Sequence, residues 1–158
     1  MTAEEIIRLL DLKPHPEGGY YRETYRSPGI SPGSQPRRSY STAIYYFLTP
    51  GTSSKMHRLD HDEVFHFYMG DPVTWVLLGP GGRFEKKVLG NRLELGETPQ
   101  LVIQAGTWFG GYLDEGGRYS LMGTTVAPGF EFQDFHLAER KTLLAGYPAA
   151  EKEILRLS

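Results

Sequence analysis

The stretch Gly51–Gly70, GTSSKMHRLDHDEVFHFYMG, decides the fold predicted for this chain. It contains two short segments with the two-residue alternation of β-strands, joined by a polar turn over residues 58–62. His57 lies on one face of the first segment, and Glu63 begins a face of the second that continues through Phe65. If these faces meet, an imidazole and a carboxyl group lie opposite each other in an aromatic-lined pocket. We therefore predict a candidate site at His57 and Glu63.

Short strands and glycine turns also make up most of the chain on either side of this stretch. Runs rich in β-branched and aromatic residues, bounded by Gly and Pro, predict further strands at residues 20–25, 41–48, 73–78, 83–89, 101–104, 107–112 and 119–126. A capping box at Thr2 predicts a short N-terminal helix, and residues 138–144 and 148–157 are predicted as C-terminal helices. Many strands without intervening helices favour an antiparallel barrel or sandwich. We therefore predict an all-β fold with short helices at both ends.

The length and composition limit the classes of protein to consider. The chain of 158 residues is expected to form a single domain, residues 1–158. It has no cysteine, which excludes disulfides, thiolate nucleophiles and zinc–thiolate sites. The formal net charge is −2 and the Lys and Arg residues are scattered, so we expect no nucleic acid and no membrane as partner. No apolar run reaches the roughly 20 residues of a spanning helix, and no secretory signal is evident, so we expect a cytoplasmic protein.

Two short motifs resemble those of the cupin superfamily. The first cupin motif is matched in spacing by Gly51, His57, Glu63 and Gly70. Leu59 stands where that motif has a second metal-binding histidine. Residues 104–109, QAGTWF, resemble the second cupin motif, with Phe109 in place of its histidine.

Over most of its length the chain is similar to a family of single-domain cupins sometimes called cupin family five. The residues that carry this resemblance are HPEGGYYRE at 15–23, His57 with Glu63 and His66, Gly106 with Trp108, and VAPGF at 126–130. The resemblance implies a double-stranded β-helix, the cupin jelly-roll barrel. It also implies a homodimer and a similarity in shape to nucleotide-sugar epimerases of the rhamnose pathway, but no particular substrate.

The resemblance implies that a metal site in this chain would have fewer protein ligands than in a metal-binding cupin. Of the four ligands of a metal-binding cupin, His57 and Glu63 remain, whereas a stable transition-metal site needs three or four nitrogen or oxygen ligands. His61 falls in the turn, and His66 falls on the strand face opposite to Glu63. We therefore predict no tightly bound metal cofactor, and a divalent transition metal on His57 and Glu63 remains an alternative.

The functional hypothesis is an isomerase or epimerase that acts on a carbonyl-containing ligand, with a nucleotide sugar as one candidate. In it, Glu63 orients His57, and His57 removes a proton alpha to the carbonyl. Tyr46 or Tyr112, on facing strands, returns the proton or stabilises an enolate oxygen. Arg22 pairs with an anionic group such as a phosphate. The other predicted ligand contacts are Phe65, Gln104, Trp108 and Phe109.

Other interpretations of the same residues stay open. A metal-dependent cupin oxidoreductase with a reduced ligand set is one, and a non-catalytic ligand-binding cupin is another. A histidine and a glutamate on neighbouring strands are in most proteins only a structural hydrogen-bonded pair. His15 and His136 are assigned no role. The aromatic strand Tyr20–Tyr25 could extend the sheet of a second copy, in agreement with a homodimer.

Overall fold

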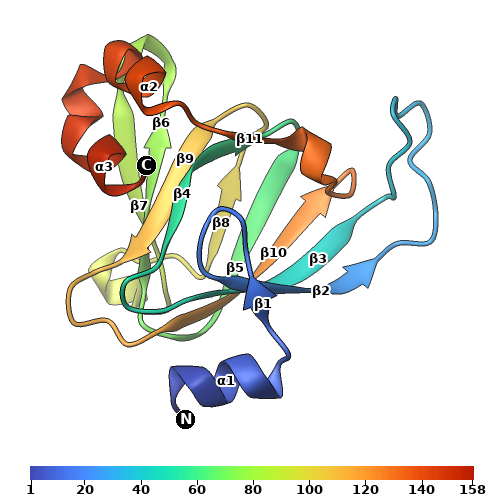
Figure 1. Ribbon diagram of the computed structural model, residues 1–158, viewed down its shortest axis with the longest axis horizontal. Coiled ribbons are helices and arrows are strands. Elements are labelled where there is room, and N and C mark those ends of the chain that lie inside the picture. The colour runs from blue at the N-terminus through green and yellow to red at the C-terminus, as the bar shows by residue number, and fades with distance from the viewer.

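The computed structural model describes residues 1–158 and shows two β-sheets packed face to face, with helices near both ends of the chain (Figure 1). The six-stranded sheet has the order β1-β2-β3-β10-β5-β8. Its strands are β1 (Lys13–Pro14), β2 (Tyr20–Arg26), β3 (Thr42–Leu48), β10 (Ser120–Ala127), β5 (Asp62–Gly70) and β8 (Gln100–Ile103). The five-stranded sheet has the order β11-β4-β9-β6-β7. Its strands are β11 (Phe135–Leu137), β4 (Ser53–Leu59), β9 (Trp108–Leu113), β6 (Val73–Leu78) and β7 (Phe84–Leu89).

All strand pairs within the two sheets are antiparallel, which confirms the predicted all-β architecture. The two strands of the Gly51–Gly70 stretch do not pair with each other. β4 lies in one sheet and β5 in the other, so the turn between them carries the chain from sheet to sheet. The faces of these strands therefore meet across the interior of the barrel.

The main hydrophobic core fills the space between the sheets. Its buried side chains alternate along each strand, as the two-residue period requires. On β3, for example, Tyr46 and Leu48 point into this core, whereas Phe47 points to the outer face. The largest side chains of the main core are Trp75, Tyr46, Phe65 and Phe109. This alternation determines which side chains reach the barrel interior.

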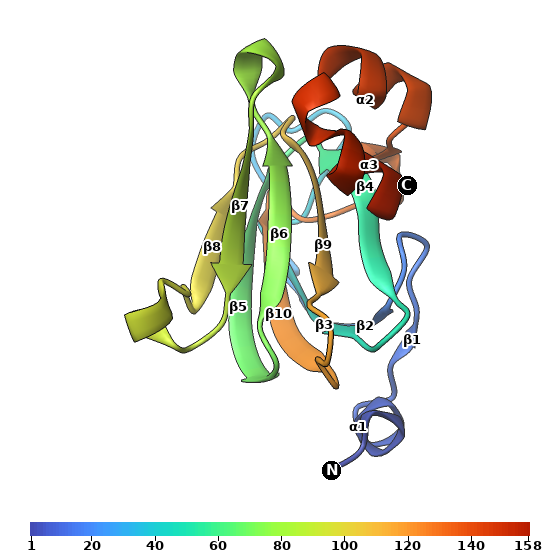
Figure 2. The same cartoon turned by 90° about the vertical axis from the view of Figure 1, so that its left-hand side faces the viewer.

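Helices pack against the outer side of each sheet and cover only part of it (Figure 2). The helix α1 (Ala3–Leu9) begins at the predicted capping box of Thr2 and Glu5, and packs through Ile6 against Phe47 and Leu121 of the six-stranded sheet. The helices α2 (Arg140–Gly146) and α3 (Glu151–Arg156) pack on the five-stranded sheet. None of these helices is long and apolar enough to cross a membrane.

The C-terminal third differs from the prediction in two places. The sequence predicts no strand after residue 126, but β11 pairs with β4 through Phe135 and Leu137. The last predicted helix, 148–157, begins with the 3₁₀ turn Pro148–Ala150 and becomes α-helical only at Glu151. Strand β11 matters for the site because it lies beside the strand that carries His57.

Candidate active site

A cavity of about 140 Å³ lies between the two sheets. Its polar lining comes from both sheets, from the loop that precedes β2 and from the segment after β10. It comprises His15, Glu17, Glu23, Arg26, Thr42, His57, Glu63, Thr124 and Glu131. Aromatic side chains form most of the remaining wall: Tyr21, Tyr46, Phe65, Phe130, Phe132 and Phe135. The cavity thus combines titratable groups with apolar rings, a composition typical of small-molecule sites.

Glu17 is the centre of the polar network in this cavity. Its side chain is buried, and its Oε2 lies 3.1 Å from Nε2 of His57. Its Oε1 accepts a hydrogen bond from the Ser54 hydroxyl at 3.1 Å. The other ring nitrogen of His57, Nδ1, lies 2.7 Å from the carbonyl oxygen of Lys55, to which it donates. A proton must therefore lie between His57 and Glu17, because two lone pairs would otherwise face each other.

The backbone around Gly18 holds Glu17 in this position. Gly18 has a φ of +113°, a conformation that side chains rarely adopt, and a Cβ at this position would collide with the carbonyl oxygen of Ser53. The loop can therefore approach β4 closely. Lys55 N–H then donates to the Glu17 carbonyl at 2.9 Å, which ties the loop to the strand that carries His57.

Two buried polar atoms in the cavity lining have no hydrogen-bond partner in the protein. They are Oε2 of Glu63 and Oγ1 of Thr124. The Glu63 residue is 8% exposed and the Thr124 residue 3% exposed. A buried polar group without a partner costs about 1–3 kcal/mol, so both atoms are sites where a ligand gains hydrogen bonds that the empty cavity lacks.

The carboxyl groups of Glu17 and Glu63 lie in different environments. Burial raises the pKa of Glu63 well above its ordinary value, and the negative charge of Glu17 raises it further. Glu63 therefore keeps its proton to higher pH than an ordinary glutamate, while Glu17 accepts hydrogen bonds from Ser54 and faces His57. The cavity thus contains one carboxyl group suited to donate a proton and one suited to accept one.

His15 and Tyr46 support the Glu17 loop. Burial lowers the pKa of His15, so its ring is neutral at neutral pH. Its Nδ1 accepts a hydrogen bond from the Glu17 backbone N–H at 3.2 Å, and its ring stacks edge-on against Tyr21 at 4.6 Å between centroids. The Tyr46 hydroxyl donates to the Gly18 carbonyl at 2.8 Å, and burial, followed by the charge of Glu17, raises the pKa of Tyr46. The Tyr46 proton is thus used to hold the loop.

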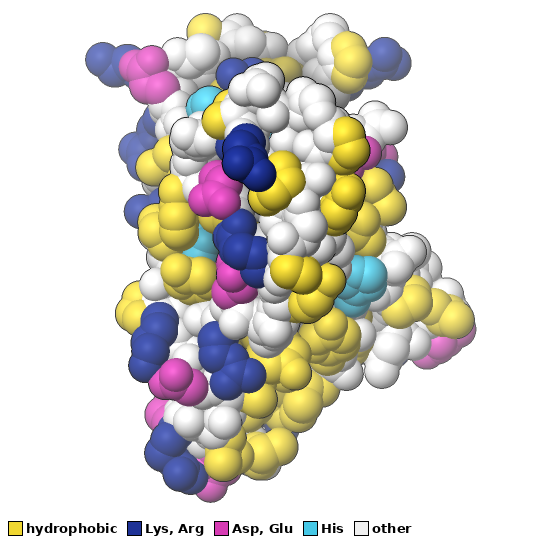
Figure 3. Space-filling view, turned by 90° about the vertical axis from the view of Figure 1, so that its right-hand side faces the viewer, with side chains coloured by type: hydrophobic (Ala, Val, Ile, Leu, Met, Phe, Trp, Pro, Cys, Tyr) yellow, Lys and Arg dark blue, Asp and Glu magenta, His cyan; other side chains and the backbone are white.

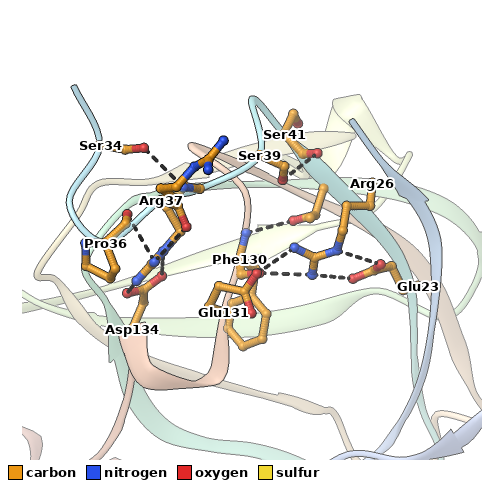
Figure 4. Close-up of polar contacts among 12 residues, drawn as sticks. Glu23, Arg26, Ser34, Pro36, Arg37, Ser39, Ser41, Phe130, Glu131 and Asp134 are labelled. Atoms are coloured by element: carbon orange, nitrogen blue, oxygen red, sulfur yellow. Dashed lines mark hydrogen bonds and ion pairs between the residues drawn. The ribbon is translucent and has the colours of Figure 1, made fainter. Parts of the chain in front are cut away.

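Residues 129–135, here called the mouth loop, border the open end of the cavity (Figure 4). Arg26 on β2 donates to the Glu131 carboxylate at 2.7 Å and to the Phe130 carbonyl at 3.1 Å. Farther along, Asp134 accepts two hydrogen bonds from the buried Arg38, at 2.8 Å and 2.5 Å. The Arg38 guanidinium holds the pKa of Asp134 below its ordinary value. Two arginines from outside the loop thus fix both of its ends.

Of the predicted site residues, His57, Glu63, Tyr46 and Phe65 line the cavity. The hypothesis paired His57 with Glu63, but the ion-pair partner of His57 is Glu17. Phe109 does not line the cavity and instead packs behind His57, with 4.2 Å between ring centroids.

The other four predicted ligand contacts lie outside the cavity. Arg22 points to the strand face opposite to Tyr21, and its guanidinium lies 5.5 Å from the ring centroid of Tyr45. Gln104 is exposed in the turn after β8. Trp108 and Tyr112 belong to the cluster under the C-terminal helices, on the outer face of β9. None of these four side chains lines the cavity.

Several residues that the sequence analysis did not assign to the site do line it. Glu17 and His15 are the chemically important ones, and Thr124 adds the unpartnered hydroxyl. The signal for the first two was the HPEGG run at 15–19, in which titratable side chains precede a glycine pair that permits close backbone approach. No comparable local signal marks Thr124.

The donor groups do not fit a metal ion in this arrangement. No group of three or more His, Cys, Asp or Glu side chains is placed to hold one. Both ring nitrogens of His57 have partners, and the two positions at which metal-binding cupins have further histidines hold Leu59 and Phe109. The groups available for chemistry in the cavity are therefore the side chains of the protein.

The architecture and this interior site define the chain as a cupin-type β-barrel with a cavity that titratable side chains line. The family model described as "Cupin superfamily (DUF985)" matches residues 4–138, and the chain belongs to this family. The resemblance drawn from the sequence motifs is thus confirmed.

Three known proteins illustrate the relationship. The crystal structure of protein SO0799 from Shewanella oneidensis superposes with a TM-score of 0.91 at 37% identity, covering 100% of this chain and 98% of that one. The uncharacterized protein YML079W of Saccharomyces cerevisiae is 29% identical over 98% of this chain and 86% of its own length. Oxalate decarboxylase from Bacillus subtilis is 15% identical with a TM-score of 0.57, over 92% of this chain and 36% of that one. This last similarity shows the cupin jelly-roll fold alone.

Proposed function

We propose that this protein is an acid–base enzyme of the isomerase or epimerase type, which moves a proton alpha to a carbonyl group of a small molecule. The observation that carries the proposal is the pair of carboxyl groups in one cavity, Glu17 with hydrogen-bond partners and Glu63 without. Enzymes separate an acid from a base by such differences in environment.

Glu17 is the base in this proposal, and His57 is its positioning partner. With its proton on Nε2, His57 donates to Oε2 of Glu17 and leaves a carboxylate that faces the ligand. The bond from His57 Nδ1 to the Lys55 carbonyl fixes the ring orientation. The roles therefore differ from the sequence-based hypothesis, in which His57 itself removed the proton.

Glu63 is the acid. As a protonated carboxyl group, it donates a hydrogen bond to the carbonyl oxygen and stabilises the negative charge that develops there when the alpha proton leaves. Return of a proton to the other face of the same carbon gives the epimer. Where that carbon carries a hydroxyl group, return of the proton to the former carbonyl carbon, with transfer of the hydroxyl proton to the carbonyl oxygen, gives the isomer. The apolar rings around the cavity exclude water, which strengthens these electrostatic interactions.

The test is exchange of the alpha hydrogen of carbonyl compounds for deuterium in D₂O, followed by NMR. We expect Glu17→Gln and Glu63→Gln each to lower the exchange rate by roughly 10²–10⁴-fold, the usual range for loss of a general acid or base. His57→Asn should lower it as well, because Glu17 loses its positioning partner. The matched control is His66→Asn, since His66 bonds to Gln100 and Thr125 outside the cavity. Undiminished exchange in both glutamine variants would refute the proposal.

A second candidate function is ligand binding without catalysis. The unpartnered oxygens of Glu63 and Thr124 serve recognition as well as they serve a reaction. A compound that raises the melting temperature but exchanges no hydrogen and undergoes no chemical change would favour this second function.

A further inference from the structure

The charged groups inside the cavity compensate one another. One proton is shared between His57 and Glu17, so this pair carries no net charge wherever the proton resides. Glu63 keeps its proton to raised pH, and the His15 ring is neutral at neutral pH. The interior therefore has many hydrogen-bonding atoms but no net charge to offer a charged ligand.

Arg26 is the one Lys or Arg among the residues that line the cavity, and its guanidinium is fully engaged. It donates twice to Glu23, at 3.0 Å and 2.8 Å, and also to Glu131 and the Phe130 carbonyl. Figure 4 shows it lying between the two carboxylates. A phosphate at the mouth would have to displace one of these partners while lying beside the other.

The surface around this end of the molecule gives no free cationic patch either. Figure 3 shows the face on the side of the long loop between β2 and β3, where basic side chains lie directly beside acidic ones. An anionic ligand that approaches this face therefore meets both signs of charge. Nothing here resembles the arginine clusters that bind phosphate groups.

From this arrangement we propose that the natural ligand is an uncharged polyhydroxy carbonyl compound, the size of a free sugar of four to six carbons. This inference rests on the proposed function for the carbonyl group of the ligand. It differs from the nucleotide sugar that the family resemblance suggested, because a diphosphate linker would need cationic partners that the cavity lacks.

The size of the cavity agrees with a free sugar. An engineered cavity of about 150 Å³ in another protein holds one benzene molecule. At the packing density of protein interiors, the 140 Å³ found here holds roughly six to ten non-hydrogen atoms. This is the range of a tetrose or pentose, with a hexose reaching into the mouth, whereas a nucleotide could only lie outside.

The lining also matches the chemistry of a sugar. Hydroxyl groups both donate and accept, so they can pair with the Glu17 carboxylate, the protonated Glu63 and the Thr124 hydroxyl. The C–H faces of a sugar can lie against apolar rings such as Phe65 and Phe135. Each unpartnered atom of the empty cavity thus gains a partner when a polyol binds.

The experiment compares free tetroses, pentoses and hexoses with their phosphate esters, with tetramethylammonium as a cationic probe. Binding is measured by thermal shift and ligand-observed NMR, and deuterium incorporation is followed in the same samples. We expect at least one free sugar to bind, and its phosphate ester to bind at least about tenfold more weakly, because the ester meets Glu23 and Glu131.

One variant tests the charge argument directly. Glu131→Gln removes one partner of Arg26, so the affinity of the ester should rise relative to that of the free sugar. Glu94→Gln removes the same charge from an exposed position and is the matched control. If Glu131→Gln leaves the ratio of ester affinity to free-sugar affinity unchanged, the proposal that Glu131 opposes phosphate binding at the cavity mouth is contradicted.

The outcomes separate this inference from the proposed function. Equal or tighter binding of the ester, tighter binding of tetramethylammonium, or no binding by any free sugar would overturn the inference. Binding of a free sugar without deuterium incorporation would support the inference and refute the proposed enzyme. Deuterium incorporation into a phosphorylated compound would support the enzyme and refute the inference.

Discussion

Replacing Glu63 by Gln should stabilise the protein increasingly as the pH rises. Burial and the charge of Glu17 raise the pKa of Glu63 in the folded chain, whereas the unfolded chain releases this proton near the ordinary value of 4.5. Between these two values the folded state binds one more proton than the unfolded state. The free energy of unfolding therefore falls with rising pH, by about 1.4 kcal/mol per pH unit from this group alone.

Glutamine has nearly the shape of a protonated glutamate but cannot ionise, so Glu63→Gln removes this dependence. Below pH 4.5, where Glu63 is protonated in both states, the two proteins should have similar stability. Above it, the difference between variant and wild type should grow by about 1.4 kcal/mol for each pH unit, until the raised pKa of Glu63 is passed. The variant should lose activity at the same time.

The assay is urea unfolding followed by tryptophan fluorescence, in steps from about pH 4.5 to about pH 8.5. The quantity of interest is the difference between the two proteins, because the contributions of titrating groups that do not interact with Glu63 cancel in it. Glu94→Gln, at an exposed position, is the matched control. A difference that does not change with pH, or a variant that becomes less stable than the wild type at high pH, would show that Glu63 is ionised in the folded chain.

Three further predictions address the metal site, the mouth loop and self-association. The double variant Leu59→His with Phe109→His restores the histidine positions of a metal-binding cupin, so it should copurify with a divalent transition metal well above the wild-type content, as measured by elemental analysis. Arg38→Met leaves a buried carboxylate without its partner, so its melting temperature should fall and amide exchange in the mouth loop should accelerate; Arg37→Met, at the exposed neighbour, should change neither. If the outer edge of β2 beyond Tyr21, which β1 leaves unpaired, pairs with a second copy, light scattering should give twice the chain mass of 17.8 kDa, and a species of 17.8 kDa would contradict the homodimer.

The strands and most of their faces could be predicted from the sequence because alternation is a local signal. On β5, Glu63 and Phe65 point inward, while His66 bonds to Gln100 and Thr125 on the other side, as the two-residue period predicted. Both inward residues line the cavity. A face could be assigned here because the two sides of the strand differ in polarity.

Strand β9 shows where this reasoning fails. Phe109 points into the barrel. Trp108 and Tyr112 lie an odd number of residues away from it along the strand, so they point to the outer face. The sequence-based prediction nevertheless assigns all three to the pocket. Both faces of β9 are buried, since the C-terminal helices cover the outer one, and no polar side chain marks the solvent side. Because both faces of β9 are apolar, the sequence does not indicate which of its side chains point into the barrel.

The role of Glu17 could not be predicted, because it depends on contacts between distant parts of the chain. The residue lies in a loop without periodicity, 37 positions before Ser54. Its place beside His57 follows from the packing of the Gly18 backbone onto β4. The mouth loop is a similar case, since β11 forms only when residues near the C-terminus meet β4. Pairing of this kind is a property of the tertiary structure.

The energetics of the cavity support the ligand site that we propose. Apolar replacements at Glu63 and Thr124 would remove two unpartnered buried atoms, each of which costs about 1–3 kcal/mol. The charge of Glu17 adds to the cost at Glu63, because it opposes ionisation of a second carboxyl group nearby. Elsewhere the buried Arg38 has its partner in Asp134, although four buried polar atoms outside the cavity, on Arg58, Trp75, Ser120 and Glu153, also lack a hydrogen bond. Proteins that are consistent throughout most of the fold tend to break the rules of packing at functional sites. Here the exceptions that line the cavity, Glu63 and Thr124, come from the two neighbouring strands β5 and β10, so a single bound molecule could satisfy both.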